Sequence, residues 1–311
     1  MRGMSPSLPV SRWRRVLAVL LSITPGCGHV LLGRWRRGLV WLGAMLLAQA
    51  SIAFLGFAGL VITLGGMLGA AVDVVRLPPR ETGVPRAGWV VLTLVGFWMV
   101  ASLVGMTTRT WLAEPFTVPS VSMLPTLLPG DHFYTDKRVA SPWRRPVERG
   151  EVIVFRPPPQ PEVRYVMRAV ALAGDTVAVR CGRLSLDGQE VERRTLGDCV
   201  GLSGVEDSCQ RDEELLGEHP HGVLGWGSCM SAMDFPSDAG CPEKMETREA
   251  GCVVPEGHVF VLGDNRDNAS DSRFWGPLPV EEVVGAARFI HFSWRPGGEG
   301  IRWGRIGTEV R

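Results

Sequence analysis

The first third of the chain consists of apolar runs separated by short clusters of arginine. From Gly38 to Val72 no residue is charged, which is about 35 residues, whereas a helix crosses a bilayer with roughly 20. We therefore expect two closely spaced helices here, with the break near Gly56 or Gly59. A later apolar run, 89–106, is long enough for one further crossing. The pattern predicts a helical membrane region over residues 1–110 with about three transmembrane helices.

The first apolar segment, 16–32, is interrupted by Pro25, Gly26 and Gly28 and has arginines at both ends. These breaks favour a re-entrant or interfacial segment, with a simple span as the alternative. A basic start and a short apolar core are also typical of a secretory signal, but no small-x-small cleavage site follows. Cys27 is expected to be a small apolar residue of this segment.

Basic side chains flank the long uncharged run on both sides: Arg34, Arg36 and Arg37 before it, and Arg76, Arg80 and Arg86 after it. Because basic flanks stay in the cytoplasm, the run should cross the membrane an even number of times. The helix at 89–106 then leads outward. We therefore expect a multi-pass protein of the cytoplasmic (inner) membrane whose part after about Arg109 lies on the extracytoplasmic, periplasmic face.

Beyond residue 110 the hydrophobic pattern changes to short β-branched runs bounded by glycine and proline. Examples are 151–155, 163–173, 175–179 and 259–262. Such runs are typical of strands joined by tight turns. The sequence predicts a mainly antiparallel β domain over 111–311.

Within this domain, residues from about 181 to 252 are acidic and glycine-rich, with weak strand signals and six cysteines. We interpret them as a cysteine-rich β insertion that lacks core residues of its own. Outside the cytoplasm an even number of cysteines favours up to three disulfides, whose pairing stays open. A zinc site is the alternative, but there is no C-x-x-C pair and the nearby histidines are His219 and His221.

The charge balance is nearly even, with 33 basic and 32 acidic residues, so nothing points to nucleic acid as a partner. No motif implies a metal or a nucleotide cofactor. Only Lys137 and Lys244 are lysines, and every other basic residue of the 33 is arginine. That scarcity limits which side chains can act as an amine base.

Two polar motifs stand at opposite ends of the β domain. FTVPSVSMLPTLLPGD, 116–131, combines the hydroxyls of Ser120 and Ser122 with three prolines, which prevent a regular helix. GDNRDNASDSRFWGPLP, 263–279, has the composition of a turn network. Taken alone they are a proline-rich loop and a solvated loop. Together, P-S-x-S-M-x-P-T-L and G-D-N-R-D-N-x-x-D-S-R-x-W-G-x-x-P resemble the signatures of bacterial type I signal peptidases, over 114–180, 253–295 and a terminal WGRIG.

This resemblance implies a serine endopeptidase that removes signal peptides from exported preproteins after Ala-x-Ala-type sites, using a serine nucleophile and a lysine base. Ser122 would be the nucleophile, and its amide and the Ser120 hydroxyl would form the oxyanion site. The positions that match the pockets for small residues are Phe116, Val118, Leu127, Tyr165 and Val166. Two ion pairs would support the site: Arg168 with Asp264, and Asp271 with Arg273.

The chain departs from the family at the general base. The lysine position is Met167, whose thioether cannot accept a proton at neutral pH. The serine that hydrogen-bonds this lysine in the family falls at Ala269, with Ser270 one residue out of register. Rescue would need another base, for which the candidates are Lys137, His132, His219 and His221. Lys244 is expected to be solvated.

Three hypotheses remain open from the sequence. The first is an active membrane-bound signal peptidase with an unrecognised base. The second is a catalytically silent homologue that binds leader peptides or regulates an active paralogue. The third is a transporter or channel built on the N-terminal helices, which is disfavoured because Asp73, near a helix end, is almost their only intramembrane charge.

Overall fold

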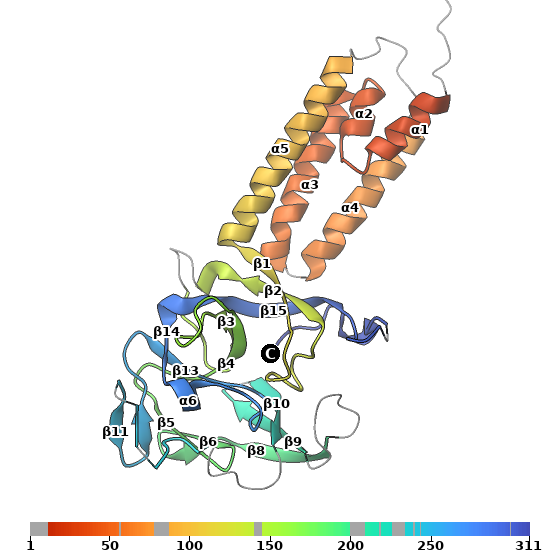
Figure 1. Cartoon of the computed structure of the whole chain (residues 1–311). Coiled ribbons are helices and arrows are strands. Elements are labelled where there is room, and N and C mark those ends of the chain that lie inside the picture. The colour runs from red at the N-terminus through yellow and green to blue at the C-terminus, as the bar shows by residue number, and fades with distance from the viewer. Residues whose placement is uncertain are drawn as a thin grey trace, which may run out of the picture. The chain divides into compact units, whose positions relative to one another are not determined.

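The computed structural model describes residues 12–55, 57–77, 87–139, 145–199, 209–217, 219–225, 234–238, 240–242, 244–298 and 300–311. The chain divides into two compact units, Met1–Thr110 and Trp111–Arg311. The first is helical and the second is built mainly from strands (Figure 1).

The described part of the first unit contains the helices α1 (Arg12–Leu21), α2 (Cys27–Leu31), α3 (Trp35–Leu55), α4 (Phe57–Arg76) and α5 (Ala87–Trp111). The segment 16–32 is a pair of short helices joined by a turn. At the end of α1 the Ser22 hydroxyl donates to the Ala18 carbonyl at 2.7 Å. The uncharged run forms α3 and α4, which pack side by side (Figure 1). Gly56, one of the two expected break points, lies outside the described residues, as do Arg80 and Arg86.

In the described ranges one helix, Ala58–Arg76, is long and apolar enough to cross a membrane. The expected number of about three crossings stays a prediction. Asp73, the charge near the end of α4, accepts a hydrogen bond from Trp41 Nε1 at 2.9 Å and lies 3.0 Å from His29 Nε2. These contacts join α2, α3 and α4, so Asp73 has a structural role in the helical unit.

The second unit contains a seven-stranded antiparallel sheet in the order β1-β2-β15-β3-β4-β13-β14. Its strands are β1 (Ala113–Thr117), β2 (Asp131–Asp136), β15 (Val283–Ser293), β3 (Val152–Phe155), β4 (Tyr165–Leu172), β13 (His258–Leu262) and β14 (Leu278–Pro279). Short runs of valine, isoleucine and phenylalanine make β3 and β13 almost wholly buried, and the middle of β4 is buried as well. The expected antiparallel β domain is therefore present.

Two smaller sheets complete the unit. One has the order β11-β12-β5-β6-β7, and the other is β10-β9-β8. Their strands are β5 (Thr176–Arg180), β6 (Arg183–Leu186), β7 (Gln189–Glu190), β8 (Arg193–Asp198), β9 (Gln210–Leu216), β10 (His219–Gly225), β11 (Glu246–Arg248) and β12 (Gly251–Val253). A short helix, α6 (Ser272–Trp275), follows β13.

The expectation that the segment 181–252 lacks core residues is wrong. Phe235, Leu184 and Leu216 are at most 1% exposed and belong to an apolar cluster with Val170 and Phe260 of the large sheet. The sequence signal was weak because these apolar residues are scattered among acidic and glycine-rich turns. The segment therefore folds onto the sheet through a shared core.

Two disulfides are described, Cys199–Cys209 and Cys241–Cys252, with Cα–Cα distances of 5.3 and 5.7 Å. Cys181 is also disulfide-bonded. Cys229 lies outside the described residues. Cys27, in the helical unit, is a free and buried thiol, consistent with its expected apolar role.

Candidate active site

The loop between β1 and β2, residues 118–130, carries Ser120 and Ser122 and is called the serine loop below. It is closed at its base, because the Val118 amide donates to the Asp131 carbonyl and the Gly130 amide donates to the Val118 carbonyl, both at 2.9 Å. The Asp131 carboxylate accepts from the Leu128 amide at 2.8 Å and pairs with Arg305. The prolines stiffen a loop whose ends are fixed by these bonds.

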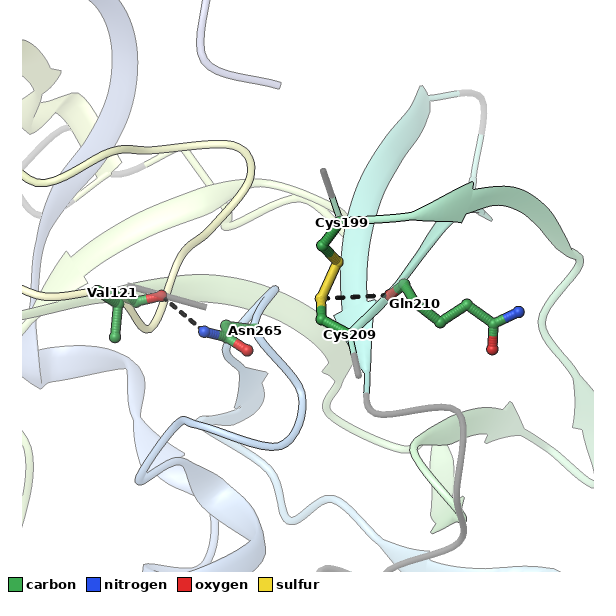
Figure 2. Close-up of a disulfide and its surroundings, with 5 residues drawn as sticks. All are labelled: Val121, Cys199, Cys209, Gln210 and Asn265. Atoms are coloured by element: carbon green, nitrogen blue, oxygen red, sulfur yellow. Dashed lines mark hydrogen bonds between the residues drawn. A yellow bond between two sulfur atoms is a disulfide. The ribbon is translucent and has the colours of Figure 1, made fainter. Parts of the chain in front are cut away.

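The GDNRDN turn, residues 263–268, is distant from the serine loop in sequence but hydrogen-bonds it in the fold. The Asn265 backbone amide donates to the Ser122 carbonyl at 3.0 Å. The Asn265 side chain donates from Nδ2 to the Val121 carbonyl at 3.1 Å (Figure 2). Gly263 lies against both Ser122 and Ala269: a Cβ on Gly263 would stand 2.7 Å from the Ser122 carbonyl oxygen and would overlap the Ala269 methyl. The structure thus brings Ser122 and Ala269 to the same place.

Apolar residues of the serine loop and β4 pack into one cluster. Val118 and Leu127 are at most 1% exposed and belong to the largest apolar cluster, and Phe116, Tyr165 and Val166 pack against it partly buried. Five residues expected to shape pockets for small side chains therefore share one apolar cluster. Met123, the residue after Ser122, belongs to it as well.

Met167 is in the same cluster and is 2% exposed. It lies on β4 opposite Ile153 of β3, which is fully buried. Ala269 is 6% exposed. The two positions at which the family resemblance places polar groups are thus filled by a methyl and by a thioether. The thioether of Met167 lies in apolar surroundings, where an isolated charge would be costly.

Ser122 is half-buried and Ser120 is exposed. In the part of the chain that the structure describes, no side chain hydrogen-bonds the Ser122 hydroxyl. The loop therefore presents a hydroxyl whose backbone is held in place and to which no described side chain is hydrogen-bonded. A serine hydroxyl is a weak nucleophile unless such a group activates it.

Arg168 and Asp264 form a bidentate buried ion pair beneath the serine loop. Their side chains are each 1% exposed, with Nε–Oδ1 at 2.8 Å and Nη2–Oδ2 at 2.6 Å. Thr126 of the serine loop donates to Asp264 Oδ2 at 2.5 Å. Burial opposes ionisation of Asp264, but the charge and hydrogen bonds of Arg168 outweigh it, so the pKa of this carboxyl lies below its ordinary value. The pair fixes the loop to the turn.

The second ion pair joins Asp271 and Arg273, with Nε–Oδ1 at 2.8 Å. Asp271 also caps α6 and accepts from the Gly263 amide at 3.1 Å. Arg273 donates to the Arg266 carbonyl. Through these two bonds the pair holds the backbone of the GDNRDN turn at Gly263 and Arg266.

Two of the alternative bases are engaged elsewhere. The Lys137 ammonium pairs with Glu114 of β1 at 3.1 Å. His132 Nδ1 lies 2.9 Å from the Thr117 hydroxyl. His132 precedes Phe133 on β2, and because successive side chains of a strand point to opposite faces, it faces away from the apolar cluster that holds Phe133 and Met167. Neither is directed at Ser122.

His221 of β10 is 1% exposed in its side chain, and its Nε2 lies 3.5 Å from Glu214 Oε2. Burial and the nearby charge of Arg168 lower the pKa of His221, which keeps the ring neutral at pH 7. It has no hydrogen bond to Ser122 among the described residues. His219 begins β10, and Lys244 is exposed, as expected.

Two further residues of this site had not been singled out from the sequence. Asn265 bonds both Val121 and Ser122, and Thr126 bonds Asp264. Both lie inside the two quoted motifs, so the motif was the available signal, but their partners are distant in sequence. In the described ranges no group of three or more His, Cys, Asp or Glu side chains is arranged to hold a metal ion.

Comparisons with known proteins identify the family of the chain. The family described as "Signal peptidase, peptidase S26" matches residues 89–294. Signal peptidase I of Pseudomonas aeruginosa is 35% identical over 208 residues, covering 60% of this chain and 67% of the relative, and that of Aquifex aeolicus is 34% identical, covering 60% and 78%. A solved signal peptidase I from Enterococcus faecalis aligns with 46% of this chain and 97% of its own, at 24% identity and a TM-score of 0.26. The family match spans well over half of the chain, which therefore belongs to the signal peptidase family, peptidase S26.

Proposed function

We propose that this protein recognises the signal peptides of exported preproteins, with the small residues of an Ala-x-Ala-type site seated against the partly buried Phe116, Tyr165 and Val166, above the buried Val118 and Leu127. The family supports the substrate class. The basic flanks of the helical unit support a multi-pass anchor in the inner membrane with the β unit on the periplasmic face.

We further propose that the protein binds the leader without cutting it at a useful rate. The observation that carries this proposal is the replacement of the base and its partner by buried Met167 and Ala269. Removal of the catalytic base of a serine hydrolase lowers turnover by roughly six orders of magnitude. In this role the protein would hold leaders or regulate an active signal peptidase in the same membrane.

A second candidate function is peptide-bond cleavage by Ser122 with a base supplied from elsewhere. The retained Ser122 and Ser120, and the bonds from Asn265 that hold the loop, favour it. The two candidates share a substrate and differ only in chemistry. Binding and cleavage are therefore tested separately.

The test of recognition uses the full chain in detergent and a fluorescent leader peptide that ends in Ala-x-Ala. The comparison peptide has Trp in place of both alanines, because a bulky ring does not fit pockets for small side chains. We expect saturable binding of the first peptide and at least about tenfold weaker binding of the second, a difference of about 1.4 kcal/mol. Equal affinity for both peptides would contradict the proposal.

The test of cleavage compares the wild type with Ser122→Ala on an intact preprotein. Equal background rates are expected for the silent homologue. Cleavage by the wild type that Ser122→Ala abolishes would establish cleavage by Ser122 and contradict the proposal that the protein only binds the leader.

A further inference from the structure

The β9–β10 hairpin of the cysteine-rich segment contacts the same turn that holds Ser122. The Leu224 amide of β10 donates to the Asp264 carbonyl, and the Arg266 amide donates back to the Leu224 carbonyl, both at 2.8 Å. Leu224 thereby pairs in parallel with Asn265. Asn265 in turn bonds the Val121 and Ser122 carbonyls. Asn265 thus connects the hairpin to the serine loop.

A small apolar cluster reinforces this connection. Leu224, Leu124 of the serine loop and Cys209 are at most 2% exposed, and Val121, Leu128 and Cys199 pack against them. The Cys199–Cys209 disulfide therefore lies against the serine loop, close to the Asn265–Val121 hydrogen bond (Figure 2). It also joins the end of β8 to the start of β9, where the Cys199 amide donates to the Cys209 carbonyl at 3.0 Å.

Two more contacts tie the hairpin to the site. A Cβ on Gly222 would stand 2.7 Å from Pro125 Cγ, so β10 touches the serine loop where only glycine fits. Glu214 of β9 forms a bidentate buried ion pair with Arg266 of the GDNRDN turn, each side chain 1% exposed. Breaking a buried pair of this kind leaves an uncompensated charge, so the hairpin and the turn are held together strongly.

We propose that the β9–β10 hairpin, whose strand β9 is crosslinked to β8 by Cys199–Cys209, positions Ser122 for the leader peptide, with Leu224 as the positioning residue. The argument rests on the leader-binding function proposed above. The hairpin holds Asn265, Asn265 holds the Val121–Ser122 backbone, and the disulfide packs behind Leu124. Loss of the crosslink should loosen the serine loop at Ser122 and so weaken the binding of the leader.

The experiment uses the full chain in detergent and two hairpin variants. Cys199→Ser/Cys209→Ser removes the crosslink, and its matched control is Cys241→Ser/Cys252→Ser, because that disulfide belongs to the other apolar cluster. Gly222→Ala pushes on Pro125 and keeps every disulfide, so it serves if the cysteine variant does not fold. Its control is Gly304→Ala, where a Cβ meets nothing within 4 Å.

Two readouts separate this proposal from the function on which it rests. Hydrogen exchange of the Asn265 amide reports on the bond to Ser122, and affinity for the Ala-x-Ala peptide reports on binding. We expect each hairpin variant to speed this exchange about tenfold and to weaken leader binding about tenfold, with both controls near the wild type. Unchanged Asn265 exchange in both hairpin variants, or equal changes in the controls, would overturn the proposal. If the wild type binds no leader, the leader-binding function fails while the exchange data still decide the coupling to Ser122.

Discussion

The buried pair of Arg168 and Asp264 offers the sharpest test of how the site is held. Asp264→Asn removes the carboxylate from a guanidinium whose side chain is 1% exposed and leaves its charge uncompensated. Breaking such a pair costs about 3 to 5 kcal/mol. The exposed pair of Arg183 and Glu190 is a matched control, because its Nη1–Oε1 distance is also 2.6 Å while the two side chains are 53% and 52% exposed. Glu190→Gln should cost less than about 1 kcal/mol.

The free energy of unfolding can be measured by urea titration of the full chain in detergent, followed by tryptophan fluorescence. The double variant Arg168→Met/Asp264→Leu should recover most of the loss, since replacing both partners by apolar side chains is often close to neutral.

Because the pKa of Asp264 in the folded protein is lowered, the pair stabilises the fold above about pH 4, and this stabilisation is lost as the pH falls through that lower pKa. The cost of Asp264→Asn should therefore shrink in acid. A cost equal to that of Glu190→Gln at pH 7 would refute this reasoning.

Two more predictions concern a histidine and a glycine of the β unit. Burial and the neighbouring His132 lower the pKa of His291 to about 4. An unfolded chain binds that proton near pH 6.5, so the free energy of unfolding should fall by less than about 3 kcal/mol between pH 6.5 and 4, and His291→Phe should flatten this slope in pH-dependent urea titrations. Gly263→Ala should lower the free energy of unfolding by about 1 to 3 kcal/mol, because its Cβ would overlap Ala269 and crowd Ser122, whereas Gly304→Ala should have little effect. A pH slope that survives His291→Phe, or equal effects of the two glycine changes, would count against these contacts.

Local sequence patterns predicted many of the strands and helices. Alternation of β-branched runs with glycine and proline predicted the antiparallel strands around Ile153 and Val261, because these strands are short and buried. The uncharged run predicted two helices, which are α3 and α4. Crossing number and orientation stay predictions, since they depend on a bilayer and not on contacts within the chain.

The sequence identified only those site residues that lie in the two motifs or match the family's other positions. Ser122 and Asn265 lie 143 positions apart, and composition does not reveal that one bonds the other. Leu224 was out of reach, because its parallel pairing with Asn265 and its packing on Leu124 are long-range contacts made by a segment with weak strand signals. Met167 could be read as a missing base, but its burial among core residues had to come from the structure.

The central claim is that Ser122 is correctly held and lacks a base. The measurement that tests it most directly is preprotein cleavage by Met167→Lys/Ala269→Ser, compared with the wild type and with the same double variant carrying Ser122→Ala. The lysine would stand in the apolar surroundings that now hold Met167, where burial lowers the pKa of an amine and keeps part of it neutral at pH 7. We predict cleavage by the double variant that Ser122→Ala abolishes, and background rates for the wild type. Efficient cleavage by the wild type, lost in Ser122→Ala, would contradict the claim.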